Sequence, residues 1–136
     1  MTNGMKVSQF MVRSPIAAEP RQPISFVRQV MLSNSYSFLP LWFRHKSREG
    51  WWFLGESEVA KYLRVAASNE ERKKRLAATV ASAVEEGMLS LIETQPVDPQ
   101  ALVRETVILL QGSTLLVVGQ EDPTRLLGIL TAFDVL

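Results

Sequence analysis

Residues 126–136 read LLGILTAFDVL, and they combine a strand signal with a helix signal. Its apolar run over 127–130, bounded by a preceding turn, is typical of a buried strand. Thr131 follows at once and belongs to the residue types that cap helix N-termini, so residues 131–134 are expected to open a helix. The stretch therefore predicts a strand that passes directly into a helix.

The same order of elements is predicted twice along the chain. In the second half, a helix that begins at Asp98-Pro99 and ends at Gly112, a strand over 115–118 and a turn over 119–124 precede this final strand. In the first half the expected elements are a helix over 23–33, a strand over 37–43, a polar loop over 44–50, a strand over 51–54 and a helix after Gly55. Aligning Val30 with Val107 places the strands of the two halves on one another, which indicates two copies of one unit.

A connecting helix is expected between the copies. Ser68 to Glu71 fits the capping-box pattern, an apolar stripe follows, and Gly87 is a typical helix stop. The basic run at 72–75 is interpreted as a solvated helix face, because acids precede it. The expected organisation is a flexible N-terminus over 1–6, a first repeat over 7–66, the connecting helix over 67–86 and a second repeat over 87–136.

Composition excludes several classes of protein. Among 136 residues, fifteen are basic and fourteen acidic, so no overall field attracts nucleic acid or an anionic membrane. The chain has no cysteine, which fits a cytoplasmic protein, and no apolar run approaches the roughly 20 residues that span a bilayer. Its single histidine, His45, falls in the polar loop, where a surface residue is a simpler interpretation than a catalytic base or metal ligand. We therefore expect a non-enzymatic protein with no catalytic cofactor, no metal and no membrane insertion.

Each half resembles a CBS domain, and the pair resembles a Bateman module. The segment Gly128 to Asp134 is similar to the family's strand-then-helix motif, a glycine, two apolar residues, a threonine or serine, two residues of any kind and an aspartate. The stretch at 11–15 is similar to the family's opening, and residues 38–41 to its Leu-Pro-Val strand. The resemblance implies an α/β fold of two β-α-β-β-α units, intertwined and packed as an intramolecular pseudo-two-fold pair with a cleft between them. It also implies a regulatory module that binds an adenosine compound (AMP, ADP, ATP or S-adenosylmethionine) and forms a homodimer.

Thr131 and Asp134 are the main candidate ligand-binding residues. The threonine hydroxyl and the free amides of a first helical turn suit a phosphate, which the helix dipole also favours. A carboxylate one turn further on accepts hydrogen bonds from two adjacent hydroxyls, as the 2′ and 3′ positions of a ribose present them. The alternative is a capping-box variant in which Asp134 bonds back to the Thr131 amide.

Weaker assignments come from the resemblance alone. It implies that the base packs against the short strand near Ile92 and Thr94, and that Thr114 faces the ligand, although Thr114 also suits an ordinary strand position. The first copy departs from the motif, because Gly55 and Glu58 stand where Thr131 and Asp134 would be. One ligand per chain is therefore expected.

Two other functions stay open at this point. The chain could be a structural dimerisation module with empty clefts, or an enzyme with an unrecognised site. The aromatic residues near the loop are interpreted as core with a possible contact surface; they are Trp42, Phe43, Trp51, Trp52 and Phe53.

Overall fold

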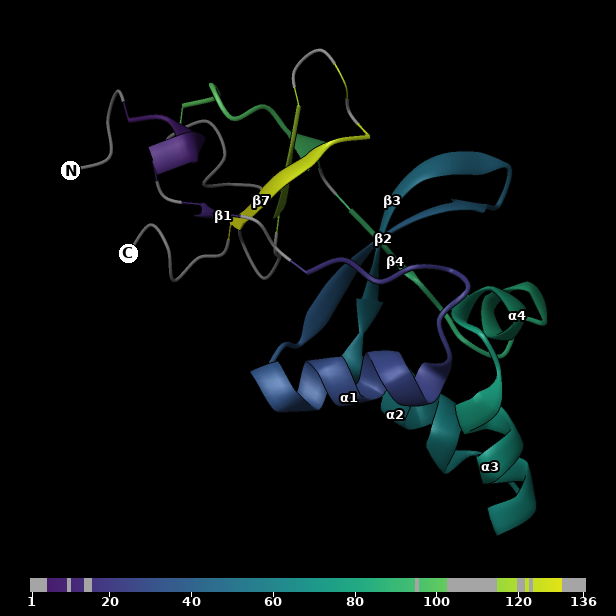
Figure 1. Ribbon diagram of the computed structural model, residues 1–136. Coiled ribbons are helices and arrows are strands. Elements are labelled where there is room, and N and C mark those ends of the chain that lie inside the picture. The colour runs from purple at the N-terminus through teal and green to yellow at the C-terminus, as the bar shows by residue number, and fades with distance from the viewer. Residues whose placement is uncertain are drawn as a thin grey trace. The chain divides into compact units, whose positions relative to one another are not determined.

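The computed structural model describes residues 5–9, 11–13, 16–94, 96–102, 115–119, 122 and 124–130. The chain divides into two compact units, one of Ile16–Glu93 and one of Met1–Pro15 with Thr94–Leu136. Each unit combines a small sheet with its own connections (Figure 1). Because the second unit contains both ends of the chain, the compact units do not coincide with the two sequence repeats.

The unit of Ile16–Glu93 holds a three-stranded sheet in the order β2-β3-β4. Its strands and helices are β2 (Phe38–His45), β3 (Arg48–Gly55), β4 (Ile92–Glu93), α1 (Ile24–Asn34), α2 (Glu56–Arg64), α3 (Asn69–Ala77) and α4 (Val80–Glu85). All neighbouring strands are antiparallel. The predicted helix over 23–33 is confirmed with a shift of one residue, because Pro23 takes an extended conformation and serves as the N-cap of α1.

The core of this unit lies between one face of the β2–β3 hairpin and the helices. Leu39, Leu41 and Leu54 alternate along the hairpin and are at most 1 % exposed. They pack with the buried faces of α1, α2 and α4, and the remaining members of this cluster are Ala18, Ile24, Val27, Met31, Val59, Tyr62, Leu63, Val80, Ala83, Val84 and Leu89. Pro40 is tolerated in β2 because its backbone faces away from β3: its carbonyl accepts from the Ala18 amide at 2.8 Å, and the missing amide points to the same side, so the β2–β3 ladder loses no donor.

The prediction of a polar loop over 44–50 is wrong, because most of this segment belongs to strands β2 and β3. Arg44 pairs with Glu49 and His45 with Arg48, so the hairpin ladder continues to a two-residue turn at Lys46 and Ser47. Both turn residues have positive φ, 53° and 61°. Two consecutive left-handed residues match the right-handed twist of a hairpin, and such a turn normally has the sequence Asn-Gly. Because Lys-Ser is not a usual sequence for this turn, the sequence gives no sign of it.

The prediction of a single connecting helix is also wrong, because this segment forms two helices, α3 and α4, with a break at Ala78 and Thr79. The segment before α1 pairs with the break: Ile24 donates to the Ala78 carbonyl, and Val80 donates to the Gln22 carbonyl, both at 2.9 Å. The Thr79 hydroxyl then caps α4 by accepting from the Ser82 amide at 3.1 Å. The predicted start of α3 and the stop at Gly87 (φ +75°) are confirmed.

The second unit holds a four-stranded sheet in the order β1-β7-β6-β5. Its elements are η1 (Val7–Gln9), β1 (Val12–Arg13), β5 (Pro96–Val97), β6 (Leu115–Val118) and β7 (Leu126–Leu130). Strands β6 and β7 confirm the predicted second hairpin. Pro99 and Gln100 form a turn rather than the predicted first turn of a helix, with Ala101 donating to the Asp98 carbonyl at 3.0 Å. The rest of that predicted helix, residues 103–112, lies outside the described residues.

The two sheets share one topology. In each, an antiparallel hairpin has a parallel neighbour on its first strand: β5 on β6, and the bridge of Ala18 to Leu41 on β2. In each, the second hairpin strand pairs with the short strand that opens the other repeat: β1 on β7, and β4 on β3. The duplication predicted from sequence is therefore visible in strand order, with the opening strands exchanged.

Candidate functional site

The first-copy site is the junction where β3 passes into α2. Gly55 ends the strand and is the N-cap of α2, with φ −96° and ψ 145°, a conformation that any residue can adopt. The Glu56 amide, first in the helix, donates to the Ser37 carbonyl at 2.9 Å. Strand and helix are thus connected without a loop, as the sequence predicts for this motif.

The Glu58 side chain lies against the backbone of Gly55. A Cβ atom built on Gly55 would collide with Oε1 of Glu58 and would lie 3.2 Å from Cδ1 of Ile92. The glutamate is half-buried and stands one turn into α2, where Glu56 adds a second negative charge to the first turn. The carboxylate therefore occupies the space that an N-cap side chain would take.

Ile92 and Thr94 are the predicted ligand residues that the structure describes. Ile92 is half-buried in β4, pairs with Phe53 of β3 and lies beside Gly55. Thr94 is buried and begins the second compact unit. The strand predicted to serve the second-copy site thus lies in the sheet of the first copy. The proposed ligand contacts of both residues stay predictions.

Thr114, Thr131 and Asp134 lie outside the described residues. The strand before Thr131 is described: β7 is paired on both sides, with Gly128 opposite Arg13 of β1 and Val117 of β6. Gly128 is buried. The backbone leading to the predicted site is therefore the inner strand of a sheet.

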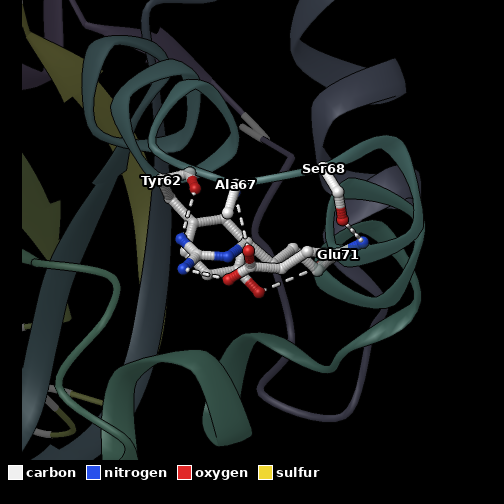
Figure 2. Close-up of polar contacts among 5 residues, drawn as sticks. Tyr62, Ala67, Ser68 and Glu71 are labelled. Carbon is white, nitrogen blue, oxygen red and sulfur yellow. Dashed lines mark hydrogen bonds and ion pairs between the residues drawn. The ribbon is translucent and has the colours of Figure 1, made fainter.

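A cluster that the sequence did not reveal joins α2 to α3 (Figure 2). Arg75 donates from Nη1 to the Tyr62 carbonyl at 2.7 Å and from Nη2 to Glu71 at 2.9 Å. The Tyr62 hydroxyl donates to the Arg75 carbonyl at 3.0 Å. Burial raises the pKa of Tyr62. Because Tyr62 belongs to the last turn of α2, the guanidinium caps a carbonyl that the helix leaves free.

Glu71 connects this cluster to the start of α3. Its amide donates to the Ser68 hydroxyl at 3.1 Å, and its carboxylate accepts from the Ala67 amide at 2.6 Å. The Ala67 hydrogen bond, and then the Arg75 hydrogen bond, hold the pKa of Glu71 below its ordinary value. The predicted cap at Ser68 is confirmed. The interpretation of residues 72–75 as a solvated face is wrong for Arg75, whose side chain is 13 % exposed.

The β2–β3 hairpin places His45 in an aromatic cluster. Its ring lies 5.0 Å from the Trp52 ring, and the Arg48 guanidinium lies 4.1 Å from the centre of Trp52. The Trp52 indole donates to the Phe43 carbonyl at 3.1 Å. Trp51, Trp52 and Phe53 are buried, as predicted.

One further hollow belongs to the second compact unit. It is an open pocket of about 520 Å³, and neither Ile92 nor Thr94 lines it. Its lining residues are Ser8, Met11, Pro99, Gln100, Arg125, Leu126 and Leu127. Lys6 donates from Nζ to Gln100 at 2.8 Å, which fixes one wall to the N-terminal segment.

The described residues lack two kinds of feature. They contain no group of three or more histidine, cysteine, aspartate or glutamate residues that could hold a metal ion. Among the helices described here, none is both long and apolar enough to cross a membrane.

No protein-family model matches the sequence, and no curated protein matches it. Solved structures do match. CBSX2 from Arabidopsis thaliana, a CBS-pair protein, is 16% identical at a TM-score of 0.67, covering 97% of this chain and 92% of that one. The chain has the fold of a CBS domain pair. The predicted resemblance and the predicted α/β class are thereby confirmed.

Two more CBS structures extend the likeness. The CBS domain of a bacterial CNNM/CorC family Mg2+ transporter is 16% identical with a TM-score of 0.69, covering 98% of this chain and 74% of that chain. The CBS domain pair of protein MJ0100, solved with 5-methylthioadenosine and S-adenosyl-L-methionine, is 18% identical with a TM-score of 0.65, covering 96% and 92%. At such identities the likeness concerns the CBS pair fold, and the ligands belong to those proteins.

Proposed function

We propose that this chain is a regulatory module that binds an adenosine compound, with AMP, ADP, ATP and S-adenosylmethionine as candidates. The observation that carries the proposal is the duplicated sheet, which has the strand order of one fold in both units. CBS pairs of this fold have been solved with AMP, with c-di-AMP and with S-adenosyl-L-methionine. Binding would bias the module between two arrangements and so alter the affinity for a partner.

The ligand site of this proposal is the start of the helix expected after β7. Thr131 would hold a phosphate and Asp134 the ribose hydroxyls, as the sequence predicts. The supporting observation is the inner position of β7, because a strand paired on both sides gives a rigid base for the residues that follow.

A non-enzymatic role is part of the proposal. The single histidine, His45, lies between Phe43 and Trp52, with ring centroids 6.4 and 5.0 Å away. Ring packing of this kind serves the hairpin and supports a structural role for the imidazole. Incubation with ATP or AMP, followed by chromatography, should leave the nucleotide intact.

We also propose that the module forms a homodimer. Phe26 and Leu32 of α1 are 51% and 48% exposed, which supports a second copy as partner. Light scattering after size exclusion should give twice the chain mass, and Phe26→Ser should lower it.

Thermal shift with each adenosine compound tests ligand binding. A compound that binds only the folded chain raises Tm. At a concentration of a hundred times its Kd, it adds about 2.7 kcal/mol to the free energy of unfolding. Asp134→Ala should abolish the shift. Asp122→Ala is the matched control, since Asp122 is exposed and bonded to Thr124 within its own turn, at 3.1 Å to the amide. A shift retained in Asp134→Ala contradicts the ribose assignment.

The alternative is a structural dimerisation module. It predicts the dimer mass together with no Tm shift for any adenosine compound at millimolar concentration. A dimer mass without any Tm shift would contradict the ligand-binding proposal and support the structural module.

A further inference from the structure

The contact between Gly55 and Glu58 is specific to the first copy. The glutamate carboxylate lies where a Cβ on residue 55 would have to go, and Ile92 closes the same point from β4 at 3.2 Å. Gly55 does not have a backbone angle that requires glycine. The glycine leaves room for Glu58 in this conformation, and a Cβ at residue 55 would displace the end of the glutamate side chain.

The position of the Glu58 carboxylate is electrostatically favourable. It lies beside the N-cap of α2, where the helix dipole carries about half a positive charge and attracts an anion. Glu56 adds a second acid in the same turn, and one first-turn amide already donates to Ser37. The end of α2 is thus supplied with negative charge by the chain itself.

The second copy has the opposite combination of residues. Thr131 and Asp134 stand at the positions of Gly55 and Glu58. A threonine Cβ is incompatible with a carboxylate folded onto the N-cap, and aspartate is one methylene shorter than glutamate. Gly55 therefore permits the carboxylate of Glu58 to fold onto the N-cap, whereas a side chain at the N-cap, as at Thr131, would direct a carboxylate three residues on away from it.

We propose that Glu58 closes the first-copy junction to phosphate-bearing ligands by occupying the anion position itself. The inference rests on the proposed function, since it explains why one nucleotide binds per chain and why it binds at the second copy. Because like charges repel one another, the Glu58 carboxylate disfavours a phosphate at this helix end.

Calorimetric titration with AMP tests the stoichiometry. The wild-type chain should bind one AMP, and Asp134→Ala should weaken AMP binding so far that it is measurable only at the highest AMP concentrations. In the Asp134→Ala background, Gly55→Thr with Glu58→Asp recreates the second-copy pair at the first copy and should regain AMP binding by roughly tenfold or more. Binding of two AMP per wild-type chain would overturn the inference, as would a folded triple variant that gains nothing.

A second variant does not depend on repacking. Glu58→Gln keeps the shape of the side chain and removes its charge. In the Asp134→Ala background it should raise the affinity for AMP relative to adenosine by about tenfold, because only AMP carries the phosphate. An unchanged ratio would overturn the inference. If the wild-type chain binds neither AMP nor any of the other three candidate compounds, the proposed function fails, and a gain of AMP binding in these variants still decides the role of Glu58.

Discussion

Replacing Arg75 with methionine tests how α2 is held to α3. The hydrogen bond from Nη1 to the Tyr62 carbonyl, at 2.7 Å, has a charged donor and contributes about 1.5–3 kcal/mol. The guanidinium lies 5.1 Å from the centre of the Tyr62 ring, which adds about 0.5–1 kcal/mol. The ion pair with Glu71 is partly exposed and adds little.

The buried Nε of Arg75 reduces the stabilisation that these contacts provide. Nε of Arg75 is buried and has no hydrogen-bond partner in the described part of the chain, which costs about 1–3 kcal/mol. Methionine has a similar length and removes that cost together with the favourable contacts. The balance is a loss of about 1 kcal/mol in the free energy of unfolding on Arg75→Met.

Urea unfolding followed by tryptophan fluorescence measures this change. The three tryptophans lie in β2 and β3, so their emission reports on the unit that contains Arg75. The midpoint should fall while the slope m stays constant. Lys73→Met, on an exposed position of the same helix, should change stability by less than about 0.5 kcal/mol. A variant at Arg75 as stable as the wild type would mean that the buried Nε outweighs the cap.

Three further outcomes are expected in the same unfolding assay. Because the hydrogen bonds from Ala67 and Arg75 lower the pKa of Glu71 in the folded chain, its contribution is present above the ordinary pKa of 4.5 and is lost as pH falls below it; Glu71→Gln should flatten the acid branch of the stability curve, and an unchanged branch contradicts this. Replacing Lys46-Ser47 by Asn-Gly should stabilise the chain by about 1 kcal/mol, because both positions have positive φ, and destabilisation would argue against this turn. Leu41→Ala, at a fully buried position, should cost about 2–5 kcal/mol, and a cost below 1 kcal/mol would place Leu41 outside the core.

The elements that sequence predicted well are those with local signals. The Ser68 cap, the stop at Gly87 and the apolar strands of both hairpins depend on residues close to one another in the chain. The break between α3 and α4 has no such signal, since it depends on hydrogen bonds from the segment before α1. The Lys46-Ser47 turn was missed because neither residue type favours a left-handed conformation.

At the candidate site, too, the sequence reveals local features but not those that depend on tertiary packing. The type of residue at Gly55 and Glu58 could be compared with Thr131 and Asp134 along the sequence, but the contact between the glycine and the carboxylate is a matter of three-dimensional packing. The placement of Ile92 beside Gly55 could not be foreseen from repeat boundaries, because β4 pairs with the preceding copy. Strands β1 and β4 have two residues each. They are too short to carry a sequence pattern that would reveal which hairpin they pair with.

The pairing of Val12 with Ile129 joins two strands that lie far apart in the sequence. That sheet cannot acquire its edge until β7 has been synthesised, and closing so long a loop makes its assembly slow. Expressing the two sequence halves as separate polypeptides would leave each without the strand that borders its hairpin. Co-expression of both halves, rather than either alone, should therefore be required for soluble material.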